Sequence, residues 1–239
     1  MELLINFFNI FLYQPLFNAL ILLYQYLPGQ DLGIAIIVLT ILIKIIFYPL
    51  GVQAIKSQKV LSELQPKIKE IQERYKNDRE KQTRAIMEFY QKEKINFFSG
   101  FLPLLIQLPI LIALFQVFWK GFGPDQMVYL YSFVPQPAEI NPIFLGMVNL
   151  GQSSPILAIL AGILQFIQTK MLTPEKKQSK SQTPDFSQII QKQMLYFFSI
   201  FTVFILLTLP SAMALYWLVM TIFSIGQQYF VLKFHAQTR

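Results

Sequence analysis

A single lysine, Lys44, stands inside a long apolar segment, and its charge is the strongest chemical feature of the sequence. The segment, 33–50, approaches the ~20 residues that a membrane-spanning helix needs. A lysine at the centre of such a helix costs roughly 2.5–3.5 kcal/mol on insertion scales, so a carboxylate or water must offset it. We expect Lys44, about 9 Å from the inner end at 1.5 Å per residue, to face water entering from that side. The alternative is that its long side chain reaches the membrane surface.

Uncharged hydrogen-bonding side chains in other apolar segments could line the same wet hollow. Thr40 lies one helical turn before Lys44 on the same face. Gln165 and Gln168 are three residues apart and also share a face. The full set is Thr40, Gln107, Gln165, Gln168, Ser224 and Gln227. Each glutamine alone could instead hold packed helices together, and for Gln107 and Gln227 this is the favoured interpretation.

The usual parts of a catalytic site are missing from the sequence. The single histidine, His235, lies in the tail, and the chain has no cysteine. The five expected spans contain no Asp or Glu, so they offer no acid–base pair, acidic proton relay or metal site. No glycine-rich phosphate loop is present. We therefore predict a protein that is not an enzyme and has no cofactor.

Five apolar segments predict an all-α integral membrane protein. The spans are expected at 33–50, 98–119, 155–172, 194–209 and 211–231. Residues 1–27 are also apolar, but Asn, Gln and Pro interrupt them, and Pro15 is expected to begin a helix. We favour a helix in the outer membrane interface here over a further span. The predicted organisation is an N-terminal interfacial region (1–32), a five-span core (33–232) and a short tail (233–239).

The basic residues indicate how this core is oriented in the membrane. Eighteen of the 20 Lys and Arg residues lie in 51–96, 170–192 and the tail, whereas 1–43 and 121–169 contain none. The positive-inside rule places the basic segments in the cytoplasm and the others outside. This alternation explains the net charge of +7 better than nucleic-acid binding does. No cleavable signal peptide is evident.

Residues 51–96 predict an antiparallel helical hairpin in the cytoplasm. Apolar residues recur at spacings of 3 and 4, as in a coiled-coil seam, and Asn77-Asp78 interrupts them before a second helix. The seam consists of Leu61, Leu64, Ile68, Ile71 and Tyr75, and it faces Ile86, Phe89 and Tyr90. Pro66 could bend the first helix. Whether the hairpin docks a partner or only packs on itself stays open. The loop 173–190 is polar and expected to be flexible.

Read in order, these segments resemble the YidC-type membrane protein insertases of the wider Oxa superfamily. The resemblance runs from about residue 14 to residue 232 and rests on six strings in the same order on the same elements. They are QPLF (14–17), IKIIFYPL (43–50), LQPKI (64–68), LPLLIQLP (102–109), FIQTKM (166–171) and PSAMALYW (210–217).

The resemblance implies five spans around a hydrophilic groove that opens to the cytoplasm and the lipid and is closed on the outside. The groove cation of the family falls on Lys44, and other groove positions fall on Gln168 and Trp217, with Tyr216 beside it. The hairpin corresponds to a mobile coiled-coil region, and 15–27 to an interfacial helix. The implied partners are nascent membrane proteins, membrane lipids and, weakly through the hairpin and the loop 173–190, the ribosome. Cooperation with a secretion translocon stays open.

Three features depart from the family pattern. Lys44 stands where arginine is usual, which keeps the charge but loses the planar five-donor fork. Met220-Thr221 replaces a common Gly-Asn pair, so the lining from the last span is less certain. The sequence shows neither a long basic tail nor a large extracytoplasmic domain.

We therefore predict an insertase that moves short polar client segments across a thinned, partly hydrated membrane. Two alternatives remain: an assembly chaperone without insertase activity, and a channel or transporter for small solutes. The channel needs a water path to the outer side, which Tyr216 and Trp217 near the outer end of the last span would obstruct.

Overall fold

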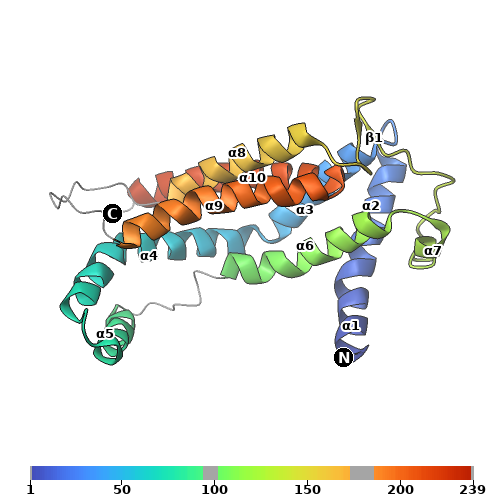
Figure 1. Ribbon diagram of the computed structural model, residues 1–239. Helices are drawn as coiled ribbons and strands as arrows, with labels where there is room; N and C mark the ends of the chain where they lie inside the picture. Colours follow the sequence, from blue (N-terminus) through green and yellow to red (C-terminus); the bar gives the residue numbers. More distant parts are fainter. Residues whose placement is uncertain (1, 94–101, 173–185, 238–239) are drawn as a thin grey trace.

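The computed structural model describes residues 2–93, 102–172 and 186–237, which are mainly helical (Figure 1). Most of the predicted loop 173–190, the end of the hairpin beyond residue 93 and the start of the span at 98 fall outside these residues. The elements are α1 (Glu2–Phe8), the π-helical turn η1 (Asn9–Tyr13), α2 (Gln14–Tyr26), α3 (Leu32–Ile46), α4 (Tyr48–Arg74), α5 (Arg79–Lys92), α6 (Leu102–Lys120), α7 (Pro124–Met127), β1 (Ile143–Phe144), β2 (Val148–Asn149), α8 (Pro155–Leu172), α9 (Phe186–Thr208) and α10 (Ser211–Gln237).

Helix α10 is the centre of the bundle. It packs against α3, α4, α6, α8 and α9, and Figure 1 shows it running beside α8 and α9. Its first six residues, 211–216, are all buried. Because a helix that is apolar on every side belongs in an interior, this segment is covered by the other helices. The core around it includes Ile36 and Ile43 of α3, Leu114 and Val117 of α6, and Ala158 and Ala161 of α8.

The pair α8–α9 depends on a glycine at its closest approach. A Cβ on Gly162 would lie 2.2 Å from Cγ2 of Val203 and 3.2 Å from the backbone oxygen of Ser199. We expect Gly162→Ala to push the helices apart and destabilise the protein by about 1–3 kcal/mol, the usual range for overpacking. Thermal unfolding in detergent micelles measures this effect.

Gly226 of α10 provides the matched control. A Cβ there meets nothing within 4 Å, so Gly226→Ala should be neutral or stabilise the helix by up to about 1 kcal/mol. Equal unfolding midpoints for the two variants would show that the close approach of α8 and α9 does not matter for stability.

The N-terminal helix is longer than the sequence predicted. Helicity begins at Glu2, and the π-helical turn Asn9–Tyr13 leads without a break into α2, where Pro15 occupies the first turn. A helix was expected to begin at Pro15. The wider turn accommodates the proline, which has no N–H to donate, so the helix continues through it. Figure 1 shows α1 and α2 running across the end of the bundle that carries β1 and not along its helices.

Helix α3 ends earlier than the apolar pattern suggested. The predicted span 33–50 stops at Ile46, and α4 leaves at a bend of 67°. Phe47 at the bend is not helical, with φ −90° and ψ 9°. Pro49 cannot donate to a carbonyl four residues earlier, and its ring crowds that carbonyl. The straight helix therefore gives way at this point, although apolar residues continue to Leu50.

Two helices among the described residues are long and apolar enough to cross a membrane, Ile5–Tyr26 and Ser211–Lys233. The bent pair α3–α4 makes three if it counts as one span. Three further apolar stretches, Gln107–Lys120, Pro155–Met171 and Tyr196–Thr208, are shorter. The protein is thus an all-α membrane protein, while the arrangement of five spans stays a prediction.

The segment between α6 and α8 is hydrogen-bonded to the end of the bundle at which α3 and α10 begin. Asn18 of α2 donates to the backbone oxygen of Tyr129 (2.9 Å) and accepts from the backbone N–H of Tyr131 (2.7 Å). Asp31 caps α3 with one carboxylate oxygen, and its other oxygen accepts from the N–H of Leu145 (2.7 Å). The backbone N–H of Ser211 donates to Gln152 oxygen at 2.7 Å. The start of α3 and the start of α10 are therefore both tied to this segment.

Helices α4 and α5 form the hairpin expected from the sequence pattern. They pack against each other, and Ile68 of the seam is buried. The seam residues Leu61, Leu64, Ile71 and Tyr75 are partly buried, as are Ile86, Phe89 and Tyr90 on α5. Pro66 lies inside α4, and Figure 1 shows the later part of α4 turning away from the bundle with α5.

Asp78 begins α5 as its N-terminal cap. Its side chain accepts from the backbone N–H of Lys81 at 3.0 Å, and this bond holds the pKa of the carboxyl below its ordinary value. A lowered pKa means that the cap stabilises the helix above the ordinary Asp pKa and is lost as the pH falls through the lowered value. We expect amide hydrogen exchange at 79–82, corrected for intrinsic rates, to rise as the pH falls from about 5 to about 3. Asp78→Asn keeps a capping oxygen without a charge, so its exchange should not follow this pH dependence.

Candidate functional site

Lys44 occupies the last turn of α3, just before the bend into α4. Its side chain is partly buried, and in the described part of the chain no carboxylate lies within ion-pair distance of it. Thr40, one turn earlier, is buried and donates to the backbone oxygen of Ile36 at 2.6 Å. The hydroxyl of Thr40 therefore donates its hydrogen bond within α3. The three N–H donors of the Lys44 ammonium group remain for water or a ligand.

Two of the predicted residues meet between α6 and α10. The side-chain amide of Gln107 donates to the hydroxyl of Tyr216, which is almost completely buried. This is the interhelical contact that the sequence analysis favoured for Gln107. It places one hydroxyl and one amide beside each other in an otherwise apolar part of the bundle.

A second polar pair lies between α8 and α10. The indole N–H of Trp217 donates to Oε1 of Gln165 at 3.1 Å, and Nε2 of Gln165 lies 3.3 Å from Oγ1 of Thr169. Gln168, on the next turn of α8, is partly buried, and no hydrogen bond of its side chain is seen among the described residues. Of the predicted site residues, Lys44 and Gln168 are therefore the two whose side chains make no hydrogen bond to another described residue.

The third group lies in the C-terminal half of α10. Gln227 is buried and donates to the backbone oxygen of Tyr48 at 3.0 Å, and Ser224 donates to the backbone oxygen of Met220 at 2.9 Å. Gln228 was not among the predicted site residues, yet it is buried and its Oε1 has no hydrogen-bond partner. In the sequence, only its position next to Gln227 marked Gln228 as a possible site residue.

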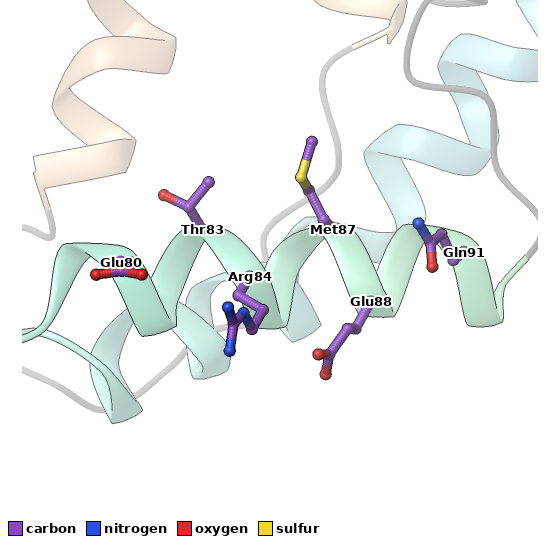
Figure 2. A pocket seen from close by; sticks show the side chains of 6 residues that line it. All are labelled: Glu80, Thr83, Arg84, Met87, Glu88 and Gln91. Carbon is purple, nitrogen blue, oxygen red and sulfur yellow. The ribbon is translucent and has the colours of Figure 1, made fainter.

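Polar residues thus lie on four helices, α3, α6, α8 and α10, with α10 in contact with the other three. Within the described ranges, no three His, Cys, Asp or Glu residues gather as metal ligands would. A surface concavity of about 530 Å³ is found on α5, away from these residues. Figure 2 shows that Glu80, Thr83, Arg84, Met87, Glu88 and Gln91 line it, all from one helix. Because one helix forms its whole lining, it does not enclose a ligand.

The helical bundle, the basic hairpin α4–α5 and the partly buried Lys44 are together typical of an integral membrane protein. The family model described as "60Kd inner membrane protein" matches residues 22–238, so the chain belongs to this family. This confirms the resemblance drawn from the six sequence strings, and it identifies the chain as a bacterial inner membrane protein.

Individual relatives carry a more specific name. The chain is 35% identical over 220 residues to the membrane protein insertase YidC of Geobacter sulfurreducens, covering 91% of this chain and 36% of that protein. It is 36% identical over 203 residues to the membrane protein insertase YidC of Fusobacterium nucleatum, covering 85% of this chain and 87% of that protein. The chain therefore spans about a third of the length of the Geobacter relative and nearly all of the Fusobacterium one.

Proposed function

We propose that the protein is a membrane insertase that moves short polar segments of nascent membrane proteins out of the cytoplasm. The observation that carries this proposal is the partly buried Lys44, which has no carboxylate partner among the described residues. A membrane protein does not keep an isolated ammonium group at such a position without a function that uses it. The proposed activity is the one in the names of the relatives, and the positive charge of Lys44 offers a physical mechanism for it.

The proposed mechanism lowers a solvation barrier and consumes no chemical fuel. A polar segment that crosses ~30 Å of hydrocarbon leaves its backbone groups without hydrogen-bond partners. A groove that opens to the cytoplasm, with Lys44 and Gln168 among its lining, hydrates the segment for part of the way. The positive charge attracts acidic groups of the client and repels basic ones. The client's apolar segment then enters lipid, at roughly 25 cal/mol per Å² of apolar area buried.

The outer end of the bundle supports a groove that is closed on that side. Tyr216 and the residues before it on α10 are buried, and the segment between α6 and α8 is bonded to α2, α3 and α10. The proposed orientation places the hairpin α4–α5 and the C-terminal end of α10 in the cytoplasm and the start of α3 outside. The proposed clients arrive on ribosomes near the hairpin, alone or through a secretion translocon.

Photocrosslinking from neighbouring positions on α8 tests the proposal. A photoreactive residue replaces Gln168, which is partly buried, or Ile167, which is exposed on the adjacent face. The protein is reconstituted in liposomes and offered ribosome-bound nascent chains of increasing length. We expect position 168, and not 167, to crosslink the polar tail of the shortest chains.

The other outcomes separate the alternatives. Crosslinks that form only with fully inserted clients would favour an assembly chaperone. Steady ion conductance in planar bilayers would favour a channel and contradict a closed outer end.

A further inference from the structure

The junction between α3 and α4 is held by one side chain of α10. Nε2 of Gln227 donates to the backbone oxygen of Tyr48, the first residue of α4, at 3.0 Å. The ring of Tyr48 meets the ring of Phe223 edge to face at a centroid distance of 6.5 Å. Because Phe223 and Gln227 are one turn apart on α10, the ring and the backbone oxygen of Tyr48 both contact this helix.

Gly51 permits this contact. A Cβ at Gly51 would lie 2.7 Å from Nε2 and 2.8 Å from Oε1 of Gln227. Real Cβ atoms do not approach other atoms so closely, so the amide of Gln227 lies directly against the first turn of α4. Any larger residue at position 51 would displace the amide from Tyr48.

The next turn of α4 continues this attachment. Ala54 and Ile55 are buried, whereas in the rest of α4 Ile68 alone is buried, on the seam with α5. The described part of the hairpin is therefore buried against the bundle over its first two turns and extends outward from there, and within the bundle α4 contacts α6 and α8 as well as α10. Lys44 lies four residues before Tyr48, on the last turn of α3.

We propose that Gln227 is the positioning residue that sets the direction in which the hairpin leaves the bundle, acting through the backbone oxygen of Tyr48. Proline at position 49 weakens the helix at the bend but does not dictate its angle, since a broken helix can pivot. A buried amide donated to a carbonyl at the pivot selects one angle. A change in that angle also moves the last turn of α3, which carries Lys44. This proposal does not depend on the proposed function.

Distance measurements between spin labels test this proposal. The natural chain has no cysteine, so two introduced cysteines give unique label sites. Met87 on α5 and Ile156 on α8 are both exposed and report the hairpin against the bundle. Ile156 and Phe230, exposed on α8 and α10, report the bundle alone. The full chain is reconstituted in lipid nanodiscs for pulsed dipolar spectroscopy.

Gln227→Met keeps the volume of the side chain and removes its donor. We expect the 87–156 distribution to shift by more than its natural width or to about double that width, while the 156–230 distribution stays unchanged. Ser224→Ala is the matched control, because the Ser224 hydroxyl is buried one turn away and bonds only within α10. It should leave both distributions unchanged.

Gly51→Ala provides an independent perturbation, should Gln227→Met fail to fold. It is expected to alter the 87–156 distribution in the natural background and to add nothing in a Gln227→Ala background, because the side chain that it strikes is gone. Such non-additivity marks two residues that act on one contact. Natural 87–156 distributions in both Gln227→Met and Gly51→Ala would overturn the proposal. So would an equal change in the 156–230 pair, which would make Gln227 a general packing residue.

Discussion

Lys44→Glu is expected to reduce insertion of a client with an acidic outer tail by tenfold or more. Two unit charges 6 Å apart interact by about 3 kcal/mol at an effective dielectric constant of 20, and reversing one charge turns attraction into repulsion. A factor of ten corresponds to about 1.4 kcal/mol, so the expected loss is conservative. The measurement is the rate of protease protection of the client tail in proteoliposomes at a fixed amount of protein.

Three comparisons make this result specific to the charge of Lys44. Lys44→Ala should fall between the natural protein and Lys44→Glu, and Lys44→Arg should retain activity because the charge is kept. Lys170→Glu changes the net charge equally at an exposed position at the end of α8 and should have little effect. A client with a basic tail should respond in the opposite direction. Undiminished insertion of the acidic client by both Lys44→Ala and Lys44→Glu would remove electrostatics from the proposed mechanism.

Asn18→Ala is expected to destabilise the end of the bundle at which α3 and α10 begin by about 1–3 kcal/mol. Asn18 is 2% exposed, and its amide uses both oxygen and nitrogen, donating to Gln14 and Tyr129 oxygens at 2.7 and 2.9 Å and accepting from the N–H of Tyr131 at 2.7 Å. The alanine variant leaves the backbone N–H of Tyr131 without this partner, whereas the backbone oxygen of Tyr129 keeps its bond from Nε2 of Gln14 at 3.1 Å. Thermal unfolding in detergent, with protease cleavage between α6 and α8 as a local readout, measures the loss.

Gln25→Ala is the matched control for this prediction. Gln25 belongs to the same helix, but its only described side-chain bond is an exposed one of 3.3 Å from Gln30. It should change the unfolding midpoint little. Similar midpoints and cleavage rates for Asn18→Ala and Gln25→Ala would show that the buried amide does not hold the outer segment.

Local signals in the sequence predicted the local features of the fold. Asn77-Asp78 was predicted to interrupt the helical pattern, and in the structure α4 ends at Arg74 and α5 begins after Asp78, because short polar side chains compete with the helical backbone. Apolar spacing predicted the seam of the hairpin, in which Ile68 is buried. The count that placed Lys44 about 9 Å from the end of its helix was wrong for α3, because α3 ends at Ile46 and has Lys44 in its last turn.

The misplaced boundaries have physical reasons that a hydropathy pattern does not contain. Apolar residues continue past Ile46 to Leu50, but α3 ends at Ile46 because Pro49 has no N–H to donate. A hydropathy scale takes no account of backbone hydrogen-bond donors. Pro15 suggested a helix start, whereas a π-helical turn absorbs it. The pairing of Gln107 with Tyr216 and of Gln227 with Tyr48 joins residues more than 100 positions apart, and only the packing of α10 decides it.

The transverse course of α1 and α2 bears on how the protein itself reaches the membrane. Under the prediction that these helices lie in the membrane interface, α3 is the first element that must cross, and under the proposed orientation residues 2–31 travel outward ahead of it. That stretch has two carboxylates, Glu2 and Asp31, and not one lysine or arginine. Its composition, acidic and without basic residues, is that of a favourable client for a cationic groove. A copy of the protein already in the membrane could thus help to insert a newly made copy.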